Sequence, residues 1–400
     1  MCKVMIKKSD ITQIWKISCF YIFSVLYFQI PELFLSFSIT KLFLFLFMVM
    51  CFVGVITKKQ KIDIFLLVVL GICLMDLIYY LVNNISCFDK IYPMVIVLII
   101  SNLYLTNSNS VKENIDLNSI NNWILGYVLI NFILYILKIQ TAFQDNGVQL
   151  QFKGALPHSN LFGNVIISLF ILIFWDKSKK SIINKMFLTL LILVTLSRTY
   201  IMLNIALWLI WLVTFWGEKI NIWIKTILGV IVVCLCGVPL FNSLVGNISY
   251  FARFSTGLFS NGNGRNYLQI YFYKALLGTT WLERLTGFNL ANRYSNLTTM
   301  EFSHSFTENS YMAVLILMGI VGFWLLSVII VGMLKKAKNI QSIAIMIIML
   351  ISLFVQDILL STQAGILFFF SLIVMRETVP QTLIKHKTHG RRKWKRLEIG

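Results

Sequence analysis

A series of apolar runs, each about twenty residues long, is the feature of this chain that most constrains its fold. A run of that length can cross the hydrocarbon core of a bilayer as a single α-helix. Of the 400 residues, 58% are hydrophobic and 13% are charged, whereas soluble domains are about 25% charged. The mean hydropathy is +0.80. The sequence therefore predicts an all-α, polytopic membrane protein.

We expect about twelve transmembrane helices from the lengths of these runs. The first run lacks a small-residue cleavage site and is expected to be a signal anchor rather than a cleaved signal peptide. The predicted helices lie at 14–32, 37–56, 63–83, 91–106, 120–138, 158–175, 186–198, 200–216, 226–244, 306–333, 341–360 and 362–376.

Lysine-rich loops set the expected orientation, because loops on the cytoplasmic side of a membrane carry an excess of Lys and Arg. With the N-terminus inside, every second loop should be basic. The basic loops that fit this rule are 58–61, 176–180, 218–225, 335–338 and the C-terminal tail. Both termini are then expected in the cytoplasm, and the segments 140–157 and 245–302 outside.

One apolar run, 186–216, is too long for a single span and is interrupted by Ser197, Arg198 and Thr199. A single tilted helix would put every later basic loop on the wrong side. Two short helices with a tight outer turn at 197–199 keep the alternation, so we expect Arg198 at the outer face.

The chain is therefore expected to have four parts. Residues 1–244 hold nine transmembrane helices, 245–305 form one large extracytoplasmic loop with an amphipathic helix at 266–277, 306–376 hold three more transmembrane helices, and 377–400 form a basic tail. The outer loop carries more basic than acidic side chains, which long loops tolerate, and this excess suggests an anionic ligand.

Composition excludes several other classes of function. The net charge of +19 is what basic cytoplasmic loops produce, so no nucleic-acid partner is expected, and the tail suits contact with anionic lipid headgroups. The seven cysteines are scattered, most of them inside apolar runs, without the spacing of a metal site or a disulfide framework. No cofactor is expected.

Two arginines are candidates for binding that anion. Arg198 lies between two spans, where a charge is costly and points to function, although it could also extend to the lipid headgroups. Arg265 follows the Gly-rich turn at 260–264 and opens a predicted helix, an arrangement that suits an anion but also an ordinary turn.

His304 and Glu308 are candidates for acid–base chemistry at the start of the helix at 306–333. A histidine with a near-neutral pKa can take a proton from a hydroxyl, and it can equally be a headgroup-level histidine with local hydrogen bonds. Glu301, His304 and Glu308 share a helix face and could hold a metal, but the set is incomplete without another ligand. No metal is therefore expected.

Further residues could support such a site. His158 and Asn160 begin the predicted sixth helix next to Pro157, where ordinary helix capping is the simplest role. Arg253 belongs to the outer loop, and Asn309 follows Glu308 directly.

The order of these motifs resembles the O-antigen ligase/polymerase (Wzy-type) superfamily. The chain has L-S-R-T at 196–199, G-R at 264–265 in a large outer loop, and H-S-x-x-E-N-S-Y-x-x-x-L-x-x-x-G-I-x-G at 304–322. It also has G-x-L-P-H-S-N-L-F-G at 154–163. The family often has His directly before Asn. In this chain Ser305, Phe306, Thr307 and Glu308 lie between His304 and Asn309, so Glu308 could share or replace the role of His304.

The resemblance implies a metal-independent, GT-C-like membrane glycosyltransferase of the bacterial cytoplasmic membrane. It would join undecaprenyl-pyrophosphate-linked oligosaccharide repeat units into capsular, exo- or O-antigen polysaccharide. Arg198 and Arg265 would bind the pyrophosphate, and His304 or Glu308 would act on the acceptor hydroxyl. Its partners would be the lipid-linked donor and acceptor, membrane lipids, a chain-length regulator and a flippase.

Three alternatives remain open from the sequence. A ligase of the same superfamily would move finished glycan to another acceptor. A polysaccharide flippase or exporter would also have about twelve spans, but transporters more often show two related halves and charges at mid-membrane. A sensor with an outer loop would not depend on two separate arginines.

Overall fold

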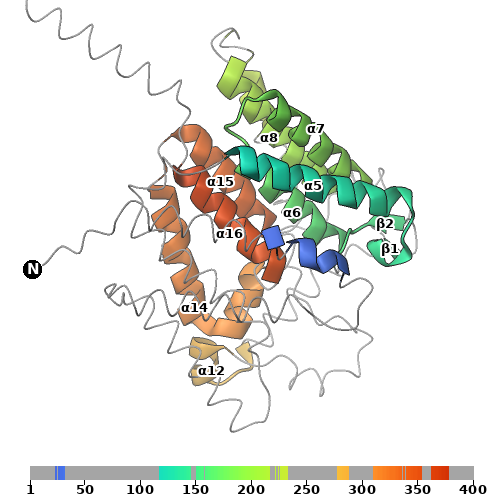
Figure 1. Cartoon of the computed structure of the whole chain (residues 1–400). Coiled ribbons are helices and arrows are strands. Elements are labelled where there is room, and N and C mark those ends of the chain that lie inside the picture. Colours follow the sequence, from blue (N-terminus) through green and yellow to red (C-terminus); the bar gives the residue numbers. More distant parts are fainter. Residues whose placement is uncertain are drawn as a thin grey trace, which may run out of the picture.

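A computed structural model of the chain describes four principal stretches, 117–145, 150–216, 277–287 and 310–377, with gaps inside them (Figure 1). Over these residues the protein is mostly helical, as the sequence predicts. The predicted helices at 37–56, 63–83 and 91–106, most of the outer loop and the C-terminal tail lie outside the described residues. The described residues in full are 23–24, 26–31, 117–145, 150–156, 158–216, 221, 224, 226–232, 277–287, 310–335, 337, 339–353 and 362–377.

Seven longer helices, two short helical turns and two short strands make up the main part of the described fold. In chain order these are α5 (Leu117–Ile136), η2 (Gln140–Ala142), β1 (Phe143–Asp145), β2 (Leu150–Phe152), α6 (Ser159–Leu172), α7 (Lys179–Val194), α8 (Arg198–Trp216), α12 (Trp281–Thr286), α14 (Ser310–Lys335), α15 (Ile340–Ser352) and α16 (Thr362–Glu377).

Among these helices, α5 alone is both long enough and apolar enough to count as a clear membrane span. Shorter apolar helices are α6, most of α8, the second part of α14, and α15. The helical character and one candidate span are therefore present in the described residues, and the total of twelve spans stays a prediction.

The expected break in the long apolar run is confirmed, because α7 and α8 are separate helices. The hydroxyl of Thr195 accepts a hydrogen bond from the backbone N–H of Ser197 (3.2 Å), and Leu196 has a positive φ of 54°. Thr189 on α7 accepts hydrogen bonds from Asn204 and Trp208 on α8, so the two helices pack side by side. Because only residues 195–197 separate them, α8 runs back along α7 in the opposite direction.

Three boundaries of this pair differ from the prediction. The helix α7 ends at Val194 instead of 198 and α8 begins at Arg198 instead of 200, so the turn lies at 195–197 and Arg198 is the first residue of a helix. The helix α7 begins at Lys179 instead of Met186, because the Ser178 side chain caps it by accepting a hydrogen bond from the Ser181 N–H (3.2 Å). Part of the expected basic loop at 176–180 is therefore helical. Its lysines still lie at the same end of the helix.

A small β-hairpin, β1 with β2, is a further difference, since the sequence predicts only a loop at 140–157. The strands are antiparallel, and their register pairs Phe143 with Phe152 and Gln144 with Gln151. Strands of three residues are too short to produce a recognisable alternation of apolar and polar residues.

The helix bundle has one end that we call the lysine end. At this end lie the starts of α5, α7 and α15 and the ends of α6 and α16. Asn121 donates to Asp176 (2.7 Å) just after α6, and Asn184 of α7 donates to the backbone oxygen of Asn121 (2.9 Å). Ser342 of α15 donates to the backbone oxygen of Met375 in α16 (3.2 Å). From α5 to α8, and from α15 to α16, successive helices therefore run in opposite directions, as expected from the basic loops.

The helix α14 is not the single continuous helix expected at 306–333. Gly319, with φ 63° and ψ −166°, breaks it into two arms that meet beside α12 (Figure 1). The rings of Tyr311 and Phe323 are 6.5 Å apart, whereas a straight helix would separate these positions by about 18 Å along its axis. The chain therefore folds back at Gly319.

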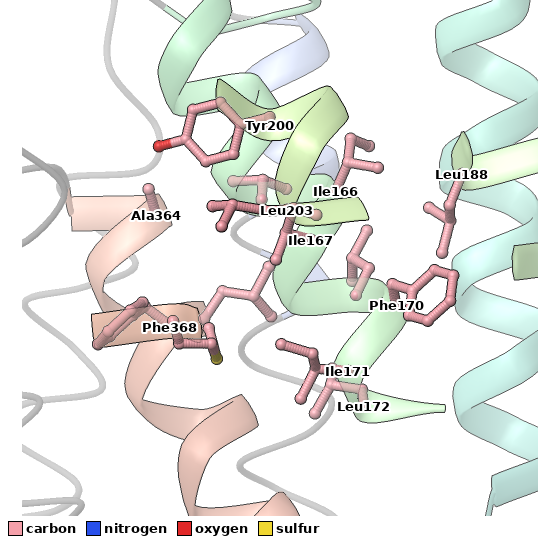
Figure 2. Close-up of a cluster of buried hydrophobic side chains, with 14 of the residues drawn as sticks. Ile166, Ile167, Phe170, Ile171, Leu172, Leu188, Tyr200, Leu203, Ala364 and Phe368 are labelled. Atoms are coloured by element: carbon pink, nitrogen blue, oxygen red, sulfur yellow. The ribbon is translucent and has the colours of Figure 1, made fainter. Parts of the chain in front are cut away.

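The hydrophobic core is built around α6, in which every residue except Asn160 is buried. Figure 2 shows its isoleucines and Phe170 between α7, α8 and α16. Tyr200 and Leu203 come from α8, and Ala364 and Phe368 from α16. This central helix carries the H-S-N motif at one end, so its position determines what surrounds the motif.

Candidate functional site at the hairpin end

The start of α6 lies against the β-hairpin, at the end of the bundle opposite the lysine end; we call it the hairpin end. His158 is the N-cap residue, and its side chain makes no capping hydrogen bond. Ser159 instead contacts both strands. Its hydroxyl donates to the Gln151 side-chain oxygen (2.8 Å), and its backbone N–H donates to that of Gln144 (3.4 Å). The hairpin thus provides a hydrogen-bond acceptor for an N–H at the start of the helix, which the His158 side chain does not cap.

The other face of the hairpin is fixed by aromatic rings. Phe143 and Phe152 are 5.3 Å apart between ring centroids, and Phe152 lies 5.3 Å from Phe162 of α6. Tyr135, at the end of α5, packs edge-on against Phe152. Edge-to-face aromatic pairs add stability beyond the area that they bury. The hairpin is therefore held firmly on the bundle, with its glutamine face toward the start of α6.

The L-S-R-T motif at 196–199 is joined by a hydrogen bond to the H-S-N motif at 158–160. The Ser197 hydroxyl donates to the Asn160 side-chain oxygen (2.7 Å). Gly163 lets the two helices approach, because a Cβ there would lie 2.6 Å from the Tyr200 ring. The start of α8, and with it Arg198, therefore lies beside the first turn of α6.

The start of α14 lies at the same end of the bundle, in contact with the end of α15. Asn164, one helical turn after Asn160, donates to the hydroxyl of Ser352 (3.2 Å) at the end of α15. The backbone N–H of Ser310 donates to the carbonyl oxygen of Leu353 (2.8 Å). Since Ser310 begins α14, the residue that follows Asn309 is placed at the hairpin end.

These contacts place some of the predicted site residues and leave the others untested. His158 and Asn160 lie at the hairpin end, and Arg198 begins α8 there, as its backbone shows. The structure describes no position for the remaining candidates, which are Arg253, Arg265, His304, Glu308 and Asn309.

The electrostatics of this end favour a negative ligand. The helices α6 and α8 both begin here, and a helix N-terminus carries unpaired N–H groups and a partial positive charge. Two adjacent N-termini with an arginine as the first residue of one of them are suited to an anion. Within the described residues, no group of three His, Cys, Asp or Glu side chains could hold a metal ion. The alternative metal site at Glu301, His304 and Glu308 lies outside them.

Sequence reasoning missed the residues that assemble this end. Ser197 immediately precedes the predicted functional arginine, and serine before a helix is a recognisable N-cap signal. Ser310 and Ser352 gave no such signal, because their contacts join helices far apart in the chain. Gln144 and Gln151 gave none either.

No protein-family model and no curated protein matches the sequence of this chain.

Proposed function

We propose that this chain is a membrane glycosyltransferase that joins undecaprenyl-pyrophosphate-linked oligosaccharide units at the outer face of the bacterial cytoplasmic membrane. The acceptor hydroxyl oxygen would form a bond to the anomeric carbon of the donor sugar. The bond from that carbon to the pyrophosphate oxygen would break, and undecaprenyl pyrophosphate would leave with the electron pair. The hydroxyl proton would pass to His304 or Glu308.

The observation that carries this proposal is the meeting of three sequence-distant segments at the hairpin end. Hydrogen bonds join Ser197 to Asn160 and Asn164 to Ser352, and the backbone of Ser310 to Leu353 next to it. These contacts bring together the L-S-R-T motif, the H-S-N motif and the residue that follows the E-N motif. The resemblance to the Wzy-type superfamily rests on the same segments.

The assigned roles follow from the chemistry of the leaving group. Pyrophosphate leaves readily when its developing charge is neutralised, so the protein must supply cationic and N–H groups and align the acceptor. Arg198, at the start of α8, and Arg265, in the outer loop, are assigned to the phosphate oxygens, which a guanidinium binds in bidentate fashion. Arg253 and Asn309 are assigned to the surroundings of the same site.

A membrane location is supported by the exposed faces of the helices. On α7, Ile183, Met186, Leu190 and Leu193 follow one another at helical spacing and are 46–58% exposed. In the part of α14 that follows Gly319, Trp324 is 60% exposed and Ile320 is 47% exposed. Large exposed apolar stripes are unfavourable in water and suit lipid acyl chains. Twelve spans with both termini in the cytoplasm complete the proposal.

The direct test is reconstitution of the purified protein in liposomes with lipid-linked repeat units extracted from the source cells. The proposal predicts a ladder of polymer and an equivalent release of undecaprenyl pyrophosphate. Glu308→Gln and His304→Ala, assayed in parallel, would identify the base, since loss of a general base slows turnover by about 10²–10⁴. Transfer of the glycan only to a different added acceptor would identify a ligase. Transport of the lipid-linked unit without any bond formation would refute the glycosyltransferase.

A further inference from the structure

The glutamine face of the hairpin carries a feature that pyrophosphate chemistry does not explain. Gln144 and Gln151 are a directly opposed cross-strand pair, so their side chains leave the sheet on the same face. Both side chains are half-buried, and both present their oxygens to Ser159. Capping one helix needs a single acceptor, whereas here two planar amides converge on one residue.

The location of this pair is defined by its neighbours. Ser159, which both amides contact, lies between His158 and Asn160. Asn160 in turn contacts Ser197, the residue before Arg198. The amides therefore lie next to the place assigned to the donor pyrophosphate, and the group bonded to that pyrophosphate is a sugar ring.

The chemistry of an amide pair suits a sugar. A glutamine side chain both donates and accepts hydrogen bonds, and so does each sugar hydroxyl. A site that hydrogen-bonds a substrate hydroxyl discriminates strongly against an analogue that lacks it. Such a site must be rigid, and the aromatic contacts of Phe143 and Phe152 beneath the pair fix the hairpin to the bundle.

We propose that Gln144 and Gln151 form a sugar-binding subsite that recognises the ring bonded to the donor pyrophosphate. This inference rests on the proposed function and extends it from the pyrophosphate to the choice of sugar. The two glutamines are specificity-determining residues, not catalytic ones.

Equilibrium binding of full-length protein in detergent to small lipid pyrophosphates tests this subsite. The probes are farnesyl pyrophosphate itself and farnesyl pyrophosphate bearing one glucose, galactose or N-acetylglucosamine. We expect at least one sugar-bearing probe to bind about five- to tenfold more tightly than the sugar-free probe, as one net hydrogen bond would provide.

The matched variants are Gln144→Glu and Gln151→Glu, because glutamate keeps an oxygen for Ser159 and loses the amide donor. We expect both variants to lose the sugar-dependent increment. The added negative charge would repel the pyrophosphate and weaken the binding of all probes alike. The ratio of the dissociation constants of the sugar-free and sugar-bearing probes therefore isolates the contribution of the sugar. Leu150→Ala, an exposed position on the same hairpin, is the control and should keep the increment.

The outcomes separate this inference from the proposed function. Wild-type protein that binds the sugar-free probe but shows no increment for any sugar would overturn the subsite and leave the pyrophosphate site standing. Retention of the increment by both glutamate variants would overturn it as well, and the hairpin would then serve only to cap α6. Failure of wild-type protein to bind any pyrophosphate probe would contradict the proposed function itself.

Discussion

The Ser197 hydroxyl donates a 2.7 Å hydrogen bond to the Asn160 side chain, and so joins the starts of two helices that lie 37 positions apart in the chain. The bond is partly buried, beside the hydrophobic core to which both helices contribute. It fixes the position of the first residue of α8, Arg198, beside the first turn of α6.

The strength of this link can be measured with a double-mutant cycle. Ser197→Ala and Asn160→Ala should each lower the free energy of unfolding, and their coupling should be about 0.5–1.5 kcal/mol, as expected for one hydrogen bond. Ser327→Ala is the control, because the exposed Ser327 hydroxyl bonds only within its own helix. Additive effects of the two single changes would show that the bond does not form in the folded protein.

The break in α14 makes a second prediction. A Cβ at Gly319 would overlap the carbonyl oxygen of Leu285 and lie 2.6 Å from the backbone nitrogen of Gly287, and its φ of 63° and ψ of −166° are open only to glycine. Gly319→Ala should therefore destabilise the protein by about 1–3 kcal/mol or more, measured by thermal unfolding in detergent.

Gly332 in the same helix is the matched control for this change. Nothing lies within 4 Å of the place that an alanine methyl group would take there, so alanine should be neutral or stabilising by up to about 1 kcal/mol. Equal effects at positions 319 and 332 would mean that α14 is a continuous helix, as the sequence alone suggests.

The orientation in the membrane is tested by single-cysteine labelling in a cysteine-free variant. Val148→Cys and Gly262→Cys should react with an impermeant maleimide in intact cells, whereas Lys179→Cys and Lys336→Cys should react only after permeabilisation. The reason is that basic segments stay in the cytoplasm. Protection of position 262 in intact cells would mean that the outer loop lies on the cytoplasmic side, which would contradict the assignment of the candidate site to the outer face.

Metal dependence separates the two uses proposed for Glu301, His304 and Glu308. Polymer formation by the reconstituted protein should continue at an unchanged rate in excess EDTA, because two arginines provide the charge stabilisation that a divalent ion would otherwise supply. Loss of activity in EDTA, restored by one added metal ion, would favour the metal site.

Much of the helical arrangement could be predicted from local sequence. The expected helices at 120–138 and 158–175 correspond to α5 and α6, with ends shifted by up to three residues. The break between α7 and α8 is predictable because Arg198 interrupts an apolar run and because lysines fix the direction of the helices around it. Charge and hydrophobicity are properties of short segments, so the sequence shows them directly.

The features that sequence missed depend on distant contacts. Gly319 lies in an apolar run that is indistinguishable from a straight helix until the backbone of Leu285 and Gly287 is placed against it. The hairpin is stabilised by rings of α5 and α6 rather than by its own short strands. The earlier start of α7 is the exception, since Ser178 is a recognisable N-cap.

The candidate site could be predicted in part. The motifs containing Asn160 and Arg198 are both assigned to the outer face by the sequence, and the structure brings these two segments together. Their pairing could not be read from the sequence, because neither motif indicates its partner. The roles of Arg265, His304 and Glu308 remain predictions from the resemblance and from their residue types.

The most direct test of the central claim is the polymerisation rate of Arg198→Lys beside that of Arg198→Ala, in protein shown to be folded and inserted. If Arg198 binds the donor pyrophosphate, lysine should be nearly as damaging as alanine, because an ammonium cannot reproduce the planar guanidinium fork. Each should reduce the rate by about thirty- to a thousandfold, which corresponds to about 2–4 kcal/mol of lost transition-state stabilisation. Polymer of normal length made at the wild-type rate by both variants would contradict the account.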